Sequence, residues 1–199
     1  MISDSHKFIF IHIPKTAGTS LCNIFLKEKA YIHTKKGRYY QSHESVKNLE
    51  ITNSNEMDKY FTFSFVRNPF RRLVSYYNFK INTKYFPPKI SFKEMCRKIY
   101  KKERKGIRDR NFLLHTRSCC EYLINKNDEI NIDFIGKVEN LQKDFDLICD
   151  KINLQKQIIP KQNKSKVVDY TDFYDNETIK IISDIYQSDL EKFNYKFGE

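Results

Sequence analysis

The chain alternates short apolar runs with segments in which apolar residues recur every three or four positions. Residues 7–13 (KFIFIHI) and 60–66 (YFTFSFV) are continuous runs of aromatic and β-branched residues, which is the pattern of strands buried on both faces. Residues 132–135 predict a third, shorter strand. A loop and a stretch with helical spacing follow each run. This alternation predicts an α/β domain with a mainly parallel sheet.

Helical spacing is clearest after the second strand, where Phe70, Leu73, Val74, Tyr77 and Ile81 form one apolar stripe. Other helices are predicted from residue 21 onward, from residue 92 toward 110, over 139–152, and over 176–193 as one closing helix. We find no internal repeat and no linker long enough to divide the chain. Residues 1–199 are therefore expected to form a single domain.

The net charge of the chain indicates the sign of a binding partner but not its chemical class. The 36 Lys and Arg exceed the 25 Asp and Glu and give a net charge of +11, which favours an anionic partner. Nucleic acid, a membrane surface, and a phosphorylated or sulfated molecule all fit. No apolar run approaches the roughly 18 residues of a membrane span, and the first residues lack the shape of a signal peptide. Peripheral membrane contact stays open, and nothing indicates the oligomeric state.

The five cysteines are odd in number and include no C-x-x-C pair. This pattern suits reduced thiols, so we expect a cytoplasmic protein rather than a disulfide framework. The five histidines are scattered, and none has ligand spacing from two cysteines. We therefore expect no metal site.

The loop after the first strand, residues 14–20 (PKTAGTS), has the features of a phosphate cradle. Backbone N–H groups of residues 17–20 would point at an anion from the positive end of the following helix, and Lys15 would add a cation. Lys15 precedes Gly18, so the loop is not a Walker A motif, which argues against an NTPase. An ordinary capped helix start is the alternative interpretation.

A second anion-ready segment follows the second strand. Arg67 stands at the carboxyl end of that strand, where open α/β sheets bind ligands, and Ser75 lies two turns into the next helix. Arg67 could instead pair with a carboxylate, and Ser75 could face solvent. Two such segments in one chain favour a ligand with two separated phosphate-type groups, such as a bisphosphorylated nucleotide.

Both segments resemble motifs of a known family. Residues 11–20 (IHIPKTAGTS) are similar to the 5′-phosphosulfate loop of sulfotransferases, and residues 65–77 (FVRNPFRRLVSYY) resemble their 3′-phosphate motif. The similarity is greatest to the branch with carbohydrate and heparan sulfate 2-O-sulfotransferases and small bacterial relatives. Residues 133–141 and 189–197 fit as well, so the resemblance covers nearly the whole chain. It implies a P-loop-like three-layer fold, with helices flanking a central, mainly parallel sheet.

The resemblance implies a donor, 3′-phosphoadenosine 5′-phosphosulfate (PAPS), whose sulfuryl group passes in line to a hydroxyl or amine without a metal. Adenosine 3′,5′-bisphosphate would be the product. Lys15 would neutralise the departing phosphate. The implied donor contacts are Lys15, Thr16, Ala17, Gly18, Thr19 and Ser20 for the 5′-phosphosulfate, and Arg67 and Ser75 for the 3′-phosphate. Lys164 and Ser165, in a loop similar to the family's Asn-x-Ser loop, would lie beside the nucleotide or else form a solvated basic loop.

An acceptor hydroxyl needs a general base, and histidine is the usual choice near neutral pH. Relatives place their base in a comparable segment between the two donor motifs. We therefore choose His43, which stands at the start of a predicted helix, with His12 and Glu44 in reserve. A structural role is favoured for His12 because it lies within the first strand. A solvent-facing role at the helix start is the alternative for His43.

The acceptor itself is not encoded in a motif. We expect a small molecule or a glycan, in particular a carbohydrate or glycolipid. Residues 93–110 hold nine Lys and Arg against three acidic residues, which suits an acidic acceptor or a solvated helix face. Relatives often carry Pro-Gln where this chain has Cys119 and Cys120, so any contact of that Gln is in doubt. The alternatives are a nucleotide kinase and a non-enzymatic nucleic-acid-binding protein, although no nucleic-acid-binding motif accompanies the basic segment.

Overall fold

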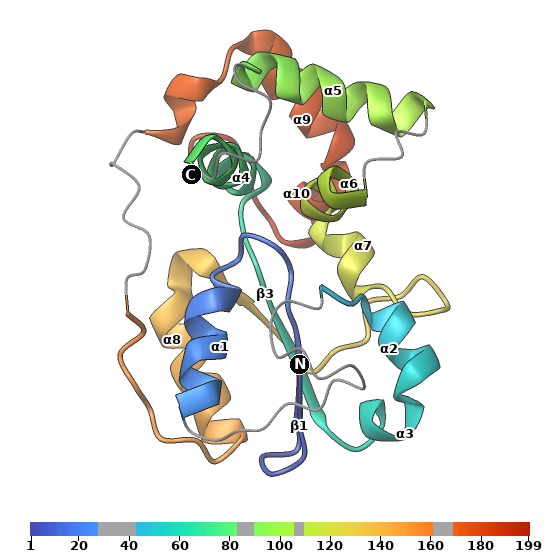
Figure 1. The fold of residues 1–199 in the computed structure, drawn as a ribbon, viewed down its shortest axis with the longest axis vertical. Helices are drawn as coiled ribbons and strands as arrows, with labels where there is room; N and C mark the ends of the chain where they lie inside the picture. The colour runs from blue at the N-terminus through green and yellow to red at the C-terminus, as the bar shows by residue number, and fades with distance from the viewer. Residues whose placement is uncertain (28–42, 83–89, 106–109, 161–168) are drawn as a thin grey trace. The chain divides into compact units, whose positions relative to one another are not determined.

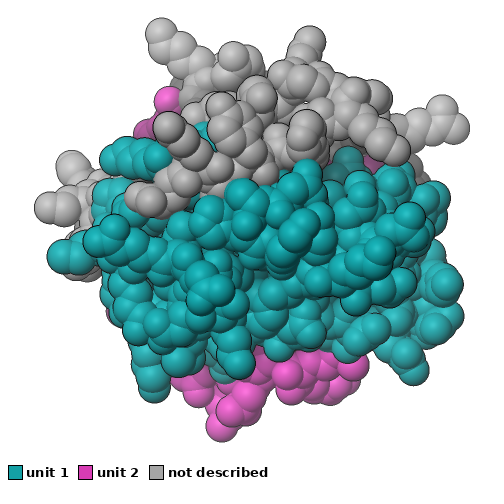
Figure 2. Space-filling model, turned by 90° about the horizontal axis from the view of Figure 1, so that it is seen from below, with its two compact units in different colours: residues 1–67, 119–162 teal, residues 68–118, 163–199 magenta. Residues whose placement is uncertain are grey.

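The structure, a computed structural model, describes residues 1–27, 43–82, 90–105, 110–160 and 169–199. The chain divides into two compact units, which Figure 2 shows in teal and magenta. The first comprises residues 1–67 and 119–162, and the second comprises residues 68–118 and 163–199. Each unit is built from two separate stretches of the chain. The expectation of a single domain stays a prediction.

The first unit holds the predicted sheet. Its strands are β1 (Ile2–Ser3), β2 (Phe8–Ile11), β3 (Phe61–Val66) and β4 (Phe134–Lys137), and they lie in that order. β2, β3 and β4 are parallel, and the short β1 pairs with β2 in the antiparallel direction. In Figure 1, α1 (Gly18–Lys27) and α8 (Leu141–Lys151) lie on one face of the sheet, and α2 (Val46–Thr52) and α3 (Ser54–Met57) on the other. The predicted α/β fold, a mainly parallel sheet flanked by helices, is confirmed.

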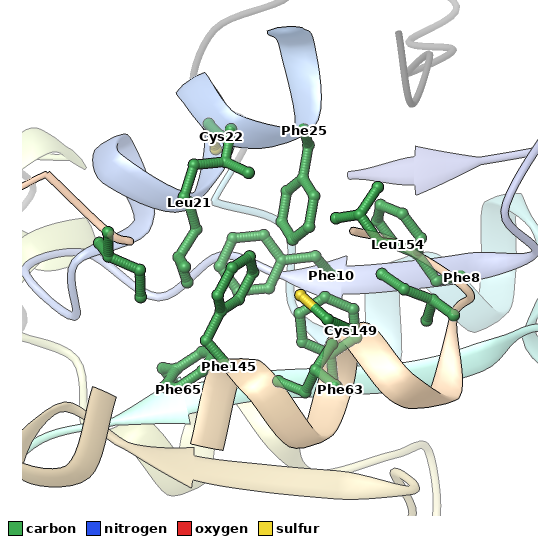
Figure 3. Close-up of a cluster of buried hydrophobic side chains, with 14 residues drawn as sticks. Phe8, Phe10, Leu21, Cys22, Phe25, Phe63, Phe65, Phe145, Cys149 and Leu154 are labelled. Carbon is green, nitrogen blue, oxygen red and sulfur yellow. The ribbon is translucent and has the colours of Figure 1, made fainter. Parts of the chain in front are cut away.

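Phenylalanines fill the space between the sheet and the helices on the α1 side. Phe10 of β2 and Phe63 of β3 stack with ring centroids 5.1 Å apart, and Phe25 of α1 and Phe145 of α8 close the cluster (Figure 3). All four side chains are fully buried. The other face of β3 is covered as well, because Thr62 and Ser64, which alternate with its phenylalanines, are also buried.

Two short helical elements complete the first unit. α7 (Cys119–Leu123) and the 3₁₀ helix η1 (Val138–Asn140) were not predicted as separate elements. Both cysteines of α7 are buried, and all five cysteines of the chain are buried residues outside any disulfide. Their burial favours a packing role over reactivity.

The second unit is helical. Its elements are α4 (Pro69–Asn82), α5 (Phe92–Lys105), α6 (Arg110–Thr116), η2 (Tyr170–Phe173), α9 (Asn176–Ile185) and α10 (Gln187–Lys192). The sequence Arg67-Asn68-Pro69 ends β3 and starts α4, since the Asn68 side chain accepts a hydrogen bond from the Phe70 N–H and proline suits the first helical position. Within the described ranges, no helix is long and apolar enough to cross a bilayer.

The single closing helix predicted over 176–193 was wrong, because the segment forms α9 and α10 with a break at Tyr186. Tyr186 has φ −106° and ψ 24° and is fully buried. Its hydroxyl donates to the Thr116 carbonyl oxygen at 2.5 Å. A long-range anchor of this kind overrides the local helical pattern, which is continuous through this residue.

Part of the basic segment has a structural role in the second unit. Lys93 bonds Asp175 at 2.7 Å and Glu177 at 2.9 Å, and Arg97 makes two bonds to Glu177. The two basic residues lie on α5 and the two carboxylates on or beside α9, so these pairs join the helices. The ammonium of Lys98 lies over the Phe112 ring. The charge of this segment is thus partly neutralised within the fold.

Candidate active site

The loop between β2 and α1 has an unusual backbone. Lys15 and Ala17 adopt positive φ angles of 68° and 64°, which non-glycine residues seldom do. Gly18 does not share this conformation. A Cβ on Gly18 would instead lie 1.9 Å from Nε2 of His12. The glycine is therefore needed for close approach of a side chain, and the strain of the turn falls on its neighbours.

Hydrogen bonds within the loop decide which of its groups can meet a ligand. The Thr16 hydroxyl donates to the Ile13 carbonyl at 2.9 Å, and the side chain is fully buried. The Ser20 N–H bonds back to the Ala17 carbonyl at 3.0 Å. Thr16 can therefore offer its backbone N–H and Ser20 its hydroxyl, while Thr19 is exposed. α1 has no acidic residue in its first turn, so the positive end of its dipole is not neutralised there.

Two cations meet at this loop. Arg67 directly follows β3, and its Nη1 lies 3.4 Å from the Lys15 carbonyl oxygen. Burial and, to a smaller extent, the nearby Arg67 charge together lower the pKa of Lys15 to about 8. Both causes disfavour the positive charge of Lys15, and a bound anion would stabilise that charge. The parallel pairing of β2 and β3 brings the two cations to the same edge of the sheet.

His43 lies at the same loop. Its Nδ1 is 2.8 Å from the backbone carbonyl oxygen of His12. A carbonyl only accepts, so Nδ1 carries the proton and Nε2 carries the lone pair of the neutral ring. The pKa of His43 is lowered mainly by burial and further by Lys15, against an opposing effect of the His12 hydrogen bond. The ring is therefore neutral at pH 7, in the tautomer that a general base at Nε2 requires.

The remaining predicted residues are less informative. The structure places Ser75 half-buried on α4, in the second unit, and its contact with a 3′-phosphate stays a prediction. Lys164 and Ser165 lie outside the described residues. Glu44 is exposed and accepts a hydrogen bond from Asn48 at 3.2 Å, so nothing directs it at the loop. His43 itself precedes the helix predicted to contain it, since α2 begins at Val46 with Ser45 as its N-cap.

The role of His12 was only partly foreseen. Its structural placement was expected, and the ring is indeed 6% exposed and stacked on Phe10. Its contacts with Gly18 and His43 were missed. The signal that could have found the Gly18 contact is the i, i+6 placement of a histidine and a glycine on either side of one tight loop. The contact with His43 spans 31 residues and leaves no local signal.

No metal centre is evident in the part of the chain that the structure describes. Nowhere in it do three or more His, Cys, Asp or Glu side chains gather closely enough to hold a metal ion. The polar groups at the loop are two cations, backbone N–H groups, hydroxyls and imidazoles. This set suits an anionic ligand rather than a cation.

Comparisons with known proteins agree with this geometry. Residues 1–196 match the sulfotransferase family. The chain is also similar to carbohydrate sulfotransferase 10 of Xenopus laevis, with 23% identity over 241 residues that cover 98% of this chain and 66% of that protein. It thus spans just under two thirds of the length of this relative. Because the match extends over nearly all of its residues, the chain belongs to the sulfotransferase family.

Proposed function

We propose that the protein transfers the sulfuryl group of PAPS to a hydroxyl group, or an amine, of an acceptor, with His43 as general base. The observation that carries this proposal is the meeting of Lys15, Arg67 and the neutral His43 at the carboxyl edge of β2 and β3. A cationic cradle beside a poised base is what in-line transfer of an anionic group requires.

The donor half follows from the charges. The loop N–H groups and the α1 N-terminus would hold the 5′-phosphosulfate, and Arg67 would bind the 3′-phosphate with Ser75. Lys15 would contact the bridging oxygen. As the S–O bond to that oxygen breaks, its electron pair stays on the 5′-phosphate, and the Lys15 ammonium offsets the new negative charge. Adenosine 3′,5′-bisphosphate is then the product.

The acceptor half depends on His43. Nε2 would take the hydroxyl proton while the acceptor oxygen bonds to sulfur, so the ring becomes an imidazolium. The Nδ1–H bond to the His12 carbonyl holds the ring in the required tautomer and stabilises that cation. A carbohydrate acceptor is proposed because the Xenopus laevis relative is named a carbohydrate sulfotransferase. No metal has a part in this chemistry.

Calorimetric binding of adenosine 3′,5′-bisphosphate tests the donor site. We expect Lys15→Ala and Arg67→Ala each to weaken binding at least about tenfold, because each removes a charge-assisted contact. Lys47→Ala is the matched control, since Lys47 lies on α2 with its side chain 50% exposed in a 3.9 Å ion pair with Asp128. Full binding by both loop variants would exclude this site.

The same titration separates the alternatives. ATP with Mg²⁺ and a short oligonucleotide are compared with the bisphosphate at one salt concentration. Tighter binding of ATP–Mg²⁺ would favour a nucleotide kinase, and tighter binding of the oligonucleotide would favour a nucleic-acid-binding protein. A screen of carbohydrate and glycolipid acceptors with radiolabelled PAPS then identifies the acceptor class.

A further inference from the structure

The His12 ring contacts two parts of the candidate site at once. On one side it lies against the start of α1, where a Gly18 Cβ would stand 1.9 Å from Nε2 and 2.0 Å from Cδ2. On another side its centroid is 4.5 Å from that of His43, at an interplanar angle of 63°. Phe10 stacks beneath it at 5.6 Å. All four residues belong to the first unit.

We propose that His12 is a positioning residue, whose ring holds His43 in the orientation of a general base and couples that orientation to the donor loop through Gly18. The inference rests on the proposed function of His43. His12 itself is not proposed to touch the acceptor or the donor.

The geometry explains why one hydrogen bond is not enough. The Nδ1–H bond to the His12 carbonyl leaves the His43 ring free to rotate about the line of that bond. The His12 ring packs against the His43 ring in an edge-to-face arrangement and restricts this rotation. His12 therefore supplies both the hydrogen-bond acceptor and the packing surface for His43. Misorientation of a base by 10–20°, or displacement by about 1 Å, is enough to reduce turnover strongly.

His12 can do this without adding charge. Burial lowers its pKa to about 3, and the neighbouring His43 and the N-terminal ammonium act in the same direction. The ring is therefore neutral near neutral pH. The charge that acts on His43 is that of Lys15, which lowers the pKa of His43. The His12 side chain then contributes shape and packing next to the base.

Gly18 gives the proposal a sharp test. In Gly18→Ala the new Cβ would displace the His12 ring, whereas in the double variant with His12→Ala that space is vacant. We expect each single change to lower kcat by about 10²-fold. The double variant should be no worse than His12→Ala alone, because both changes act through one ring. If Gly18 acts instead through donor binding by its backbone, the two losses multiply, and the proposal is overturned.

A second measurement does not depend on sulfuryl transfer. The ring NMR signals of His43 report its orientation, and we expect one sharp set in the wild type. In Gly18→Ala and His12→Ala the ring signals should shift and broaden as the ring gains rotational freedom, while the Nδ1–H tautomer is kept because the backbone carbonyl of His12 remains. Gly136→Ala is the control, because its Cβ would crowd a ring in the same unit, Phe65 at 2.5 Å, and the nearest atoms around it belong to neither His12 nor His43. An unchanged His43 spectrum in Gly18→Ala contradicts the coupling. If the coupling holds but no acceptor is sulfated, only the proposed function fails.

Discussion

At the scale of single residues, the site depends on two side chains whose pKa values are lowered chiefly by burial. Burial and the Arg67 charge lower the pKa of Lys15, and burial is the main cause that lowers the pKa of His43. The lowered pKa keeps His43 neutral, as a general base requires. A bound anion would raise the pKa of Lys15 again. The pH dependence of the reaction therefore reports both groups.

We predict a bell-shaped profile of kcat/KM. His43 must be neutral, so the rate falls on the acid side below a pKa that is lower than 6.5. Lys15 must be charged, so the rate falls again as the pH rises through about 8. In Lys15→Arg the alkaline limb near pH 8 should disappear, since arginine stays protonated. Persistence of that limb in the variant would assign it to another group.

Removal of the base should separate turnover from binding. We expect His43→Ala to lower kcat by about 10²–10⁴-fold, because proton transfer loses its acceptor. Binding of adenosine 3′,5′-bisphosphate should stay within about twofold. His6→Ala is the matched control, since His6 lies near the N-terminus and contacts only Ser5 among the bonds described for its ring. Turnover of His43→Ala near that of the control would end the assignment.

At the scale of secondary structure elements, local patterns predicted β2 and β3, because each lies in a run rich in aromatic and β-branched residues. The third predicted strand, over 132–135, overlaps β4, and the short β1 was not predicted. The helix break at Tyr186 and the short α7 were not predictable, since long-range packing produces them. A polar clamp shows how tertiary contacts also tie strands together. The Asp133 carboxylate accepts the Thr62 N–H at 2.7 Å and the Thr62 hydroxyl at 2.8 Å, which joins the start of β3 to the residue before β4.

We expect Asp133→Ala to reduce the free energy of unfolding by about 1–2 kcal/mol, because Thr62 is buried and loses its charged acceptor. Chemical denaturation measures the effect. Asp128→Ala is the control, because its side chain is 77% exposed and its ion pair with Lys47 is 3.9 Å long. Equal stability of the two variants would show that the clamp contributes nothing.

At the scale of the whole molecule, the basic residues behind the net charge of +11 have different roles. Lys15 and Arg67 stand at the candidate donor site, whereas Lys93 and Arg97 are paired with carboxylates at α9. Among the described residues, part of the basic excess is thus already paired with carboxylates of the fold. Whether the other basic residues of 93–110 meet an acidic acceptor is a question for the acceptor screen.

Donor-site occupancy should stabilise the folded protein. At a concentration 100 times its dissociation constant, adenosine 3′,5′-bisphosphate adds about 2.7 kcal/mol. For a chain of this size we expect Tm to rise by about 5–10 °C. Lys15→Ala should show a much smaller rise and Lys47→Ala the full one. A larger rise with ATP–Mg²⁺ than with the bisphosphate would contradict the proposed donor.

By itself, the sequence determined the order of strands, loops and helices and identified the loop of residues 14–20 and Arg67 as anion-ready. These are local features, set by the spacing of apolar residues and by loop composition within about twenty residues. The tertiary structure decided that Gly18 serves the His12 ring rather than the turn, and that the His12 carbonyl fixes the tautomer of His43. The contact of His12 with His43 joins residues 31 positions apart, which no local pattern encodes, and that of His12 with Gly18 depends on the path of the loop between them.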